Sequence, residues 1–345
     1  PFLTARVVKD WVPDYEGDLN YPESAKEEYP DLVTPEEYTA FVAGKILDGI
    51  KEAWNNRTKA KVGTGTGFAD VASPDRCYFD NGDGTWYLNW SYCNPDKAKG
   101  YVNDVDGIKA VETLGFWDYN TGELLGIAAG IFTPAQTSSN DKFVSSDLWH
   151  FVREKLRDAY GIDVPLVSFT LFAGDCGPKG PLQYAGYSVA RGIYEGLIEA
   201  KNNITKNPVL RHERFQIDNL PLYRATKEEY EEAAEKIRKR NEQGILDSFS
   251  NYFDYAVTGR YELQREKPTH EIFVHAVRLG KTAMGTVPFE MFMPFARELR
   301  AKLNYNQVLP IELTEQMHGY LGTERVVTYR SIKLHHSAFL LSPQA

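Results

Sequence analysis

Apolar residues recur along this chain with two periods, the helical one and the shorter one of strands. Between residues 34 and 55 they follow helical spacing behind Thr34-Pro35-Glu36-Glu37, a capping box with proline at the first helical position. The capping pattern recurs at Thr226, before a highly charged helical stretch that runs to Arg240. The spacing predicts three more helices, over residues 146–161, 184–201 and 290–303.

Short apolar runs between these helices predict strands. The runs 114–119 and 124–132 flank Asn120-Thr121-Gly122, a hairpin signature, and a second pair of runs turns at Gly280. Residues 61–67, KVGTGTG, are predicted as a glycine-bearing strand, because no Gly-Lys-Ser/Thr follows them and no helix opens there, as a phosphate-binding loop requires. The other predicted strands are 164–173, 271–279, 281–288 and 307–313.

This alternation of helices and strands predicts an α/β fold with mixed β-sheets flanked by helices. No internal repeat or low-complexity linker divides the chain, so we expect a single domain over residues 1–345. With 42% hydrophobic residues and no apolar run near about 18 residues, the composition is typical of a water-soluble protein with no membrane span. The net charge of -9 and the lack of a long Lys/Arg run argue against a nucleic acid partner.

The cysteines and the start of the chain bear on its compartment. Cys77 and Cys93 are candidates for a disulfide in an oxidising environment, and free thiols are the alternative interpretation. The sequence opens at Pro1 with no initiator Met, basic segment or apolar leader, so any targeting segment is absent or lies upstream. The localisation is therefore unknown from these residues.

A sharp turn, Gly174-Asp175-Cys176-Gly177-Pro178, follows the buried run 164–173. Ligands of open α/β sheets bind at the carboxyl ends of strands, so Asp175 and Cys176 are candidate catalytic residues. Asp175 would orient a substrate group or a backbone turn. Cys176 would be a nucleophile, or a small buried apolar residue.

Several separated blocks resemble the neutral ceramidase family, and they occur in the family's order over about 300 residues. The resemblance implies the catalytic domain of a zinc amidase, without its N-terminal strands. It also implies a secreted or extracytoplasmic location and a small-molecule or lipid-like N-acyl substrate. The blocks are residues 40–67, 122–134, 145–147, 172–178, 277–290 and 319–323.

Neutral ceramidases hold zinc with two His, one Glu and one Tyr. A bound zinc lowers the pKa of its water to roughly 7 and polarises the substrate carbonyl. Glu290, in Val-Pro-Phe-Glu, matches the ligand carboxylate of the family, and Tyr320, in Gly-Tyr-Leu-Gly-Thr, matches its ligand tyrosine, which also makes Tyr320 a candidate catalytic residue. The resemblance therefore implies Zn²⁺ as the cofactor. Glu290 has a second interpretation, as a cap of the helix predicted to begin there.

The chain departs from the family at three places. The family's His-Pro is Thr133-Pro134 here, and its serine near the scissile bond is Gly177. No histidine precedes Ala40, so the family's His-x-His block is expected upstream or on a partner chain. His318, two residues before Tyr320, is the best substitute ligand, although a lone His is often held by structural hydrogen bonds instead.

These observations give one main hypothesis and two alternatives. The main hypothesis is a hydrolase of N-acyl amide bonds on a neutral-ceramidase-like scaffold, assisted by zinc. The first alternative is a non-catalytic, ligand-binding relative or subunit with a degenerate metal site. The second is a metal-free enzyme that uses Cys176 or Asp175. A partner chain or a homo-oligomer is expected if the upstream block is supplied in trans, because this chain would otherwise leave a sheet edge unpaired.

Overall fold

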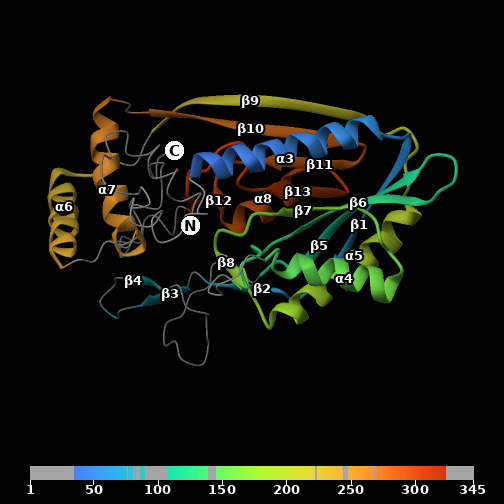
Figure 1. The fold of residues 1–345 in the computed structure, drawn as a ribbon, viewed down its shortest axis with the longest axis horizontal. Coiled ribbons are helices and arrows are strands. Elements are labelled where there is room, and N and C mark those ends of the chain that lie inside the picture. Colours follow the sequence, from blue (N-terminus) through green and yellow to red (C-terminus); the bar gives the residue numbers. More distant parts are fainter. Residues whose placement is uncertain are drawn as a thin grey trace. The chain divides into compact units, whose positions relative to one another are not determined.

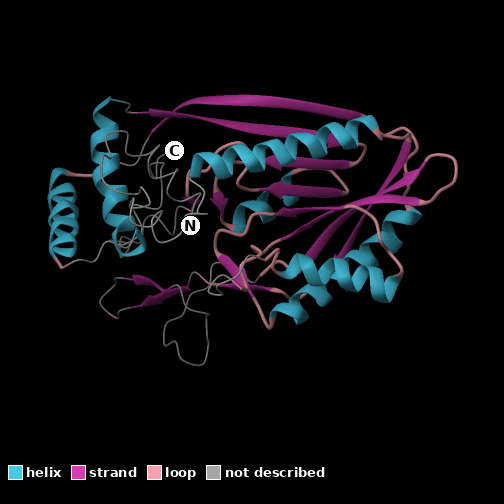
Figure 2. Cartoon of the chain, viewed as in Figure 1, coloured by secondary structure: helices cyan, strands magenta, loops and turns pink. Residues whose placement is uncertain are grey.

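In this computed structural model, the residues that the structure describes form two compact units (Figures 1 and 2). Among the described residues, the larger unit lies within 59–218 and 271–323, and the smaller one within 35–58 and 219–270. Because the chain passes between the units several times, the single domain expected from the sequence stays a prediction. The described residues are 35–75, 77–80, 82, 86–89, 107–138, 145–221, 224–243, 248–266 and 269–323.

The first sheet of the larger unit has the strand order β1-β5-β6-β7 (Figure 1). Its first three strands are antiparallel, while β6 and β7 run parallel. The predicted hairpin joins β5 to β6, and Gly122 takes the left-handed conformation, with φ 76°, that its turn requires. The strands are β1 (Ala60–Phe68), β5 (Ala110–Asp118), β6 (Leu124–Ile131) and β7 (Leu166–Thr170).

A second mixed sheet has the order β13-β11-β10-β9. β10 and β11 form the second predicted hairpin, with Gly280 at φ 59°, and β11 runs parallel to β13. The helix α8 (Met293–Lys302) lies between β11 and β13 in the chain and supplies the crossover that a parallel pair needs. The strands are β9 (Leu210–Pro221), β10 (Thr269–Leu279), β11 (Thr282–Thr286) and β13 (Gln307–Ile311).

Three two-stranded sheets complete the mixed α/β architecture that the sequence predicts. β2 pairs with β8 and β3 with β4, both antiparallel, whereas β12 pairs with β14 in parallel. Their bounds are β2 (Ala72–Pro74), β3 (Cys77–Asp80), β4 (Trp86–Asn89), β8 (Cys176–Pro178), β12 (Glu290–Met291) and β14 (Tyr320–Leu321).

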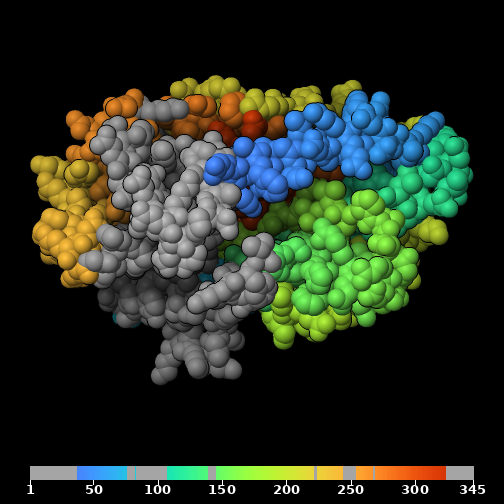
Figure 3. Space-filling view, in the orientation of Figure 1, coloured from blue at the N-terminus to red at the C-terminus, as the bar shows by residue number. Residues whose placement is uncertain are grey.

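Two helices, α4 (Leu148–Tyr160) and α5 (Leu182–Asn202), cover one face of the first sheet, and their outer sides form part of the surface in Figure 3. The glycines of β1 let α5 approach closely: a Cβ atom at Gly65 would lie 2.1 Å from the carbonyl oxygen of Gly196. Side chains of α5 also accept hydrogen bonds from this edge strand, such as Glu199 from the Thr66 amide at 2.8 Å. β1 is thus closed to further pairing.

The other face of the first sheet packs against the second sheet. Leu114 of β5 and Leu171, which directly follows β7, share a buried apolar cluster with Leu309 from β13. A buried polar contact crosses the same layer, where Gln307 Nε2 donates to Glu112 Oε2 at 2.9 Å and Arg300 pairs with the other oxygen at 2.9 Å. The Glu112 charge is therefore compensated although the side chain is fully buried.

The smaller unit contains α3 (Pro35–Asn55), α6 (Lys227–Glu242) and α7 (Ser248–Glu266). Both arms of the predicted capping box at Thr226 are present, and an Arg240–Asp254 ion pair joins α6 to α7. Neither β9 nor α7 was predicted. For β9 the reason is that nearly all of its residues are exposed, so no apolar face marks it as a strand. None of the described helices is both long and apolar enough to cross a bilayer.

The structure corrects one boundary that matters for function. The predicted helix 290–303 begins only at Met293, with Phe292 as its N-cap, and Glu290 lies in β12. The interpretation of Glu290 as a helix cap is therefore wrong. Cys93 lies outside the described residues, so the disulfide with Cys77 stays a prediction.

Candidate functional site

The carboxyl ends of four strands, β6, β7, β11 and β13, meet at one edge of the larger unit. The Leu171 amide donates to the carbonyl of Ile131 (2.9 Å), the Phe172 amide to Pro310 (3.0 Å), and the Val287 amide to Ile311 (3.0 Å). These backbone bonds bring the segments that follow the strands together. Such an edge is where α/β sheets bind their ligands.

Glu312 lies at the centre of this edge, immediately after β13. Its side chain is 6% exposed, and Oε2 accepts hydrogen bonds from the amides of Ala173 (3.0 Å) and Met291 (3.2 Å). Burial raises the pKa of this carboxyl well above its usual range, and the negative charges of Glu290 and Asp175 raise it further, against the opposing effect of the two amides. Three carboxyl groups therefore influence one another here.

The turn at 173–175 is fitted closely to β12. The Gly174 amide donates to the carbonyl of Met291 (2.9 Å), and a Cβ atom at Gly174 would lie 2.3 Å from the carbonyl oxygen of Glu290. Only glycine leaves room for this approach. The turn thus holds the backbone of Glu290 in place.

Asp175, predicted at this turn, is 4% exposed. Its Oδ1 accepts a hydrogen bond of 2.7 Å from the amide of Met293, the first residue of α8. A carboxylate at a helix N-terminus satisfies an amide that has no partner inside the helix. Asp175 therefore positions α8 relative to the turn.

Cys176 is 3% exposed and belongs to the apolar cluster between the sheets. Its Sγ lies 3.6 Å from Sδ of Met293. This environment favours the second interpretation of Cys176, a small packed residue. At Gly177, where the family has serine, a Cβ atom would lie 3.0 Å from Oδ2 of Asp75, so an acid occupies the space beside that position.

Glu290 and Tyr320, matched from two separate blocks of the sequence, are direct neighbours. They face each other in the parallel register of β12 and β14, and the Glu290 amide donates to the carbonyl of Gly319 at 2.9 Å. Both residues are partly exposed. Neither residue is therefore fully enclosed in the core.

His318 lies in the loop that joins β13 to β14. Its ring is 5.9 Å from that of Phe289, the residue is 8% exposed, and its amide donates to the carbonyl of Pro288 at 2.8 Å. The loop has positive φ at two non-glycine residues, Leu313 (53°) and Glu315 (67°). Strained conformations of this kind persist only where the surroundings impose them, and they cluster at functional sites.

The described residues do not fit the zinc site that the sequence resemblance implies. Thr133, at the family's histidine position, is fully buried, and its hydroxyl makes no hydrogen bond within the described part of the chain. Among the described residues, no three His, Cys, Asp or Glu side chains are grouped so that they could hold one metal ion. A hydroxyl is also a weaker zinc ligand than an imidazole.

The sequence reasoning missed Glu312 and Asp75. Glu312 follows the buried run Gln307–Ile311, as Asp175 follows β7, so the rule that selected Asp175 also points to Glu312. Asp75 gave no such signal, because it reaches Gly177 through the β2–β8 pairing of distant segments.

Comparison with solved structures identifies the fold. The crystal structure of neutral ceramidase from Pseudomonas aeruginosa aligns with a TM-score of 0.58 and 13% identity, over 86% of this chain and 52% of that protein. The chain has a ceramidase-like fold. A structure described as ceramidase complexed with C2 aligns with a TM-score of 0.54 and 12% identity, over 83% of this chain and 51% of the other.

The chain thus spans about half the length of each ceramidase that it matches. No family model and no curated protein matches the sequence. At this identity the likeness concerns the fold alone. It confirms the ceramidase-like α/β architecture that the ordered sequence blocks predict, and activity has to be argued from the site.

Proposed function

We propose that this chain carries the active site of a hydrolase of N-acyl amide bonds, located where β12 and β14 meet the turn at 173–175. The observation that carries the proposal is the pairing of Glu290 with Tyr320 on adjacent strands. The ceramidase-like fold is one support for the proposal. The position of the pair is another, since it lies near the carboxyl ends of the strands, where α/β sheets bind ligands.

The proposed roles follow from the chemistry of the side chains. The Glu290 carboxylate accepts a proton from a water molecule as its oxygen attacks the acyl carbon. The Tyr320 hydroxyl donates a hydrogen bond to the acyl oxygen, where negative charge develops. The carbon–nitrogen bond then breaks, and the proton held by Glu290 passes to the departing nitrogen, giving an acid and an amine. Asp175 and Glu312 are positioning residues, since both bond to the backbone around β12.

Zinc stays a prediction of the sequence resemblance, and no step above depends on it. A bound zinc would require ligands in addition to the described residues, from the rest of the chain, from an upstream segment or from a partner chain, with Glu290, Tyr320 and His318 as the candidates among the described residues. Metal analysis of the purified protein, together with the intact mass of every co-purifying chain, tests both points. We also propose an extracytoplasmic location, on the ceramidase likeness alone.

The test of the proposed function is hydrolysis of a panel that ranges from N-acetyl amino acids to short- and long-chain N-acyl sphingosines, with the released acid quantified. We expect at least one member to be cleaved, and Glu290→Gln to slow cleavage about 100-fold or more, since the general base is lost. Glu228→Gln, at an exposed residue of α6, is the matched control and should leave the rate unchanged. Equal rates in the Glu290→Gln variant and the wild type would refute the assigned base.

A second candidate function is ligand binding without turnover. It is favoured by Thr133 and Gly177, which replace two functional side chains of the ceramidase family, and by the buried hydroxyl of Thr133. In that case N-acyl compounds bind and are recovered intact. The same panel separates the two candidates when binding is measured beside product release.

A further inference from the structure

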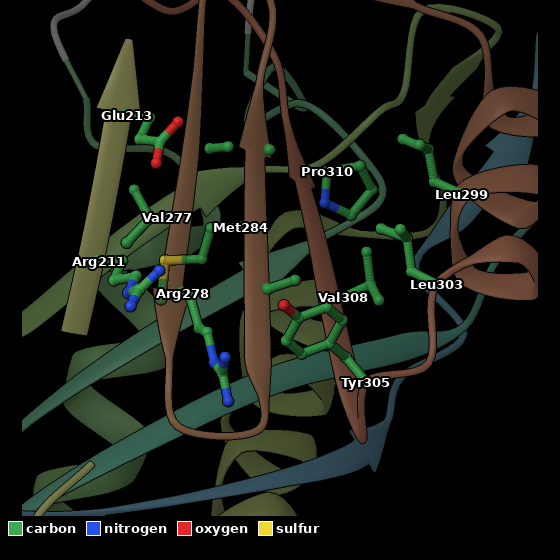
Figure 4. Close-up of a pocket in the computed structure, with 13 residues that line it drawn as sticks. Arg211, Glu213, Val277, Arg278, Met284, Leu299, Leu303, Tyr305, Val308 and Pro310 are labelled. Atoms are coloured by element: carbon green, nitrogen blue, oxygen red, sulfur yellow. The ribbon is translucent and has the colours of Figure 1, made fainter. Parts of the chain in front are cut away.

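A hollow of about 390 Å³ lies on the second sheet of the larger unit (Figure 4). Small residues form its floor: Ala276 of β10 pairs with Gly285 of β11, and Ala283 of β11 pairs with Val308 of β13. A Cβ atom at Gly285 would meet no atom within 4 Å. The hollow exists because these positions lack the side chains that would fill it.

The two sides of the hollow differ in chemistry. Leu299 and Leu303 come from α8 and its end, and Tyr305 follows them, so this side is apolar with one phenol. Figure 4 shows Arg211 and Arg278 on the opposite side, beside β9 and β10. A volume in the range of about 300–1,000 Å³, apolar walls and a few polar groups are typical of small-molecule sites.

Within the part of the chain that the structure describes, the side chains of the two arginines of the hollow pair with no acid. The Arg211 side chain forms no hydrogen bond or ion pair with another residue in the described ranges. Arg278 donates only to the carbonyl of Gly280, at 3.1 Å, among those residues. By contrast, Arg214 and Arg300 each pair with a glutamate. Among the described residues that line the hollow, Glu213 is the one acid, so the side chains of these residues carry a net charge of +1 (two Arg and one Glu).

We propose that this hollow binds a small amphipathic monocarboxylate, such as a medium-chain aliphatic acid. The hydrocarbon tail would lie on the floor of Ala276, Ala283 and Gly285, against the leucines of α8. The carboxylate would lie toward Arg211 and Arg278, whose guanidinium groups match its geometry. Glu213 disfavours a dianion, so the net charge of the lining selects a monoanion. None of the lining residues belongs to the candidate active site, and the proposal does not depend on the proposed function.

Isothermal titration with decanoate, below its aggregation concentration, tests the charge requirement. Decanol and decyltrimethylammonium are the matched neutral and cationic probes. We expect saturable binding of one decanoate per chain, with the neutral probe about tenfold weaker, because it lacks the charge-assisted hydrogen bonds, and the cation weaker still. Equal affinity for the three probes, or no binding of decanoate, would overturn the proposal.

Paired variants test the location. Gly285→Leu places a side chain into the hollow and should abolish decanoate binding, whereas Gly285→Ala adds a Cβ atom that meets nothing and should retain it. Arg211→Gln with Arg278→Gln should weaken decanoate about tenfold or more and leave decanol unchanged, while Arg191→Gln on α5 should change neither. Full binding in a folded Gly285→Leu protein, as judged by circular dichroism, would place the ligand elsewhere.

Discussion

Carboxylates serve as acceptors for backbone amides in two regions of this molecule, and the regions differ in what surrounds those acids. Along the edge strand β1, glutamates of α5 accept hydrogen bonds from backbone amides at an exposed position. At the strand ends, Glu312 does the same while buried, with Glu290 and Asp175 acting on its pKa. The first arrangement closes a sheet edge at little electrostatic cost. The second crowds acids together, which a purely structural role does not require.

The largest expected effect is on the contact between β1 and α5. In Gly65→Ala the new methyl group would clash with the carbonyl of Gly196, 2.1 Å from the Cβ position, so β1 and α5 must separate. We expect a loss of about 3 kcal/mol in the free energy of unfolding, measured by denaturant titration. The control is Gly126→Ala in β6, where the Cβ atom meets the carbonyl of Pro165 at an ordinary 3.5 Å. Similar stability of the two variants would contradict the close β1–α5 contact.

A smaller effect is expected in the strand-end region. Asp175→Ala removes the acceptor of the buried Met293 amide at the start of α8. We expect a loss of about 2 kcal/mol in unfolding free energy, as for a helix cap with a buried donor left unpaired. Asp163→Ala, at an exposed loop residue, is the control and should change stability by less than about 0.5 kcal/mol. If the two variants lost the same free energy, Asp175 would not hold α8.

The smallest expected effect is on how the free energy of unfolding depends on pH in two variants, Glu312→Gln and Glu315→Gln. Because the pKa of Glu312 is raised in the folded state, its contribution to stability is present below its unfolded pKa and is lost as pH rises through the folded pKa. We therefore expect Glu312→Gln to gain stability relative to wild type as pH rises from 5 to 8.

Glu315 provides the opposite case. Its bond to Arg214 lowers its pKa to about 2, so its contribution is present above its unfolded pKa and is lost as pH falls through the folded one. Glu315→Gln should accordingly approach wild-type stability below pH 4. Unfolding curves of both variants across pH 3 to 8 measure this, and parallel profiles would contradict the raised pKa of Glu312.

The elements with local sequence signals could be predicted, whereas the contacts of the candidate site could not. The capping box at Thr226 and the turns at Gly122 and Gly280 are local signals, and the elements that they predict are present. Glu290 and Tyr320 were selected by resemblance, but their pairing depends on the register of β12 and β14, which no local pattern fixes. The Gly177–Asp75 approach likewise arises from strands far apart in the chain. Local periodicity thus predicted most elements, while the contacts that make the site are tertiary.

The most direct test of the account is the rate of acid release from the N-acyl panel by the wild type and by Glu290→Gln, with Glu228→Gln measured in parallel. The account predicts cleavage by the wild type and by the Glu228 variant, and a rate lower by about 100-fold or more without the Glu290 carboxylate. Intact substrates recovered from all three proteins, under conditions where binding is measured, would contradict the hydrolase and leave a ligand-binding protein on the ceramidase-like fold.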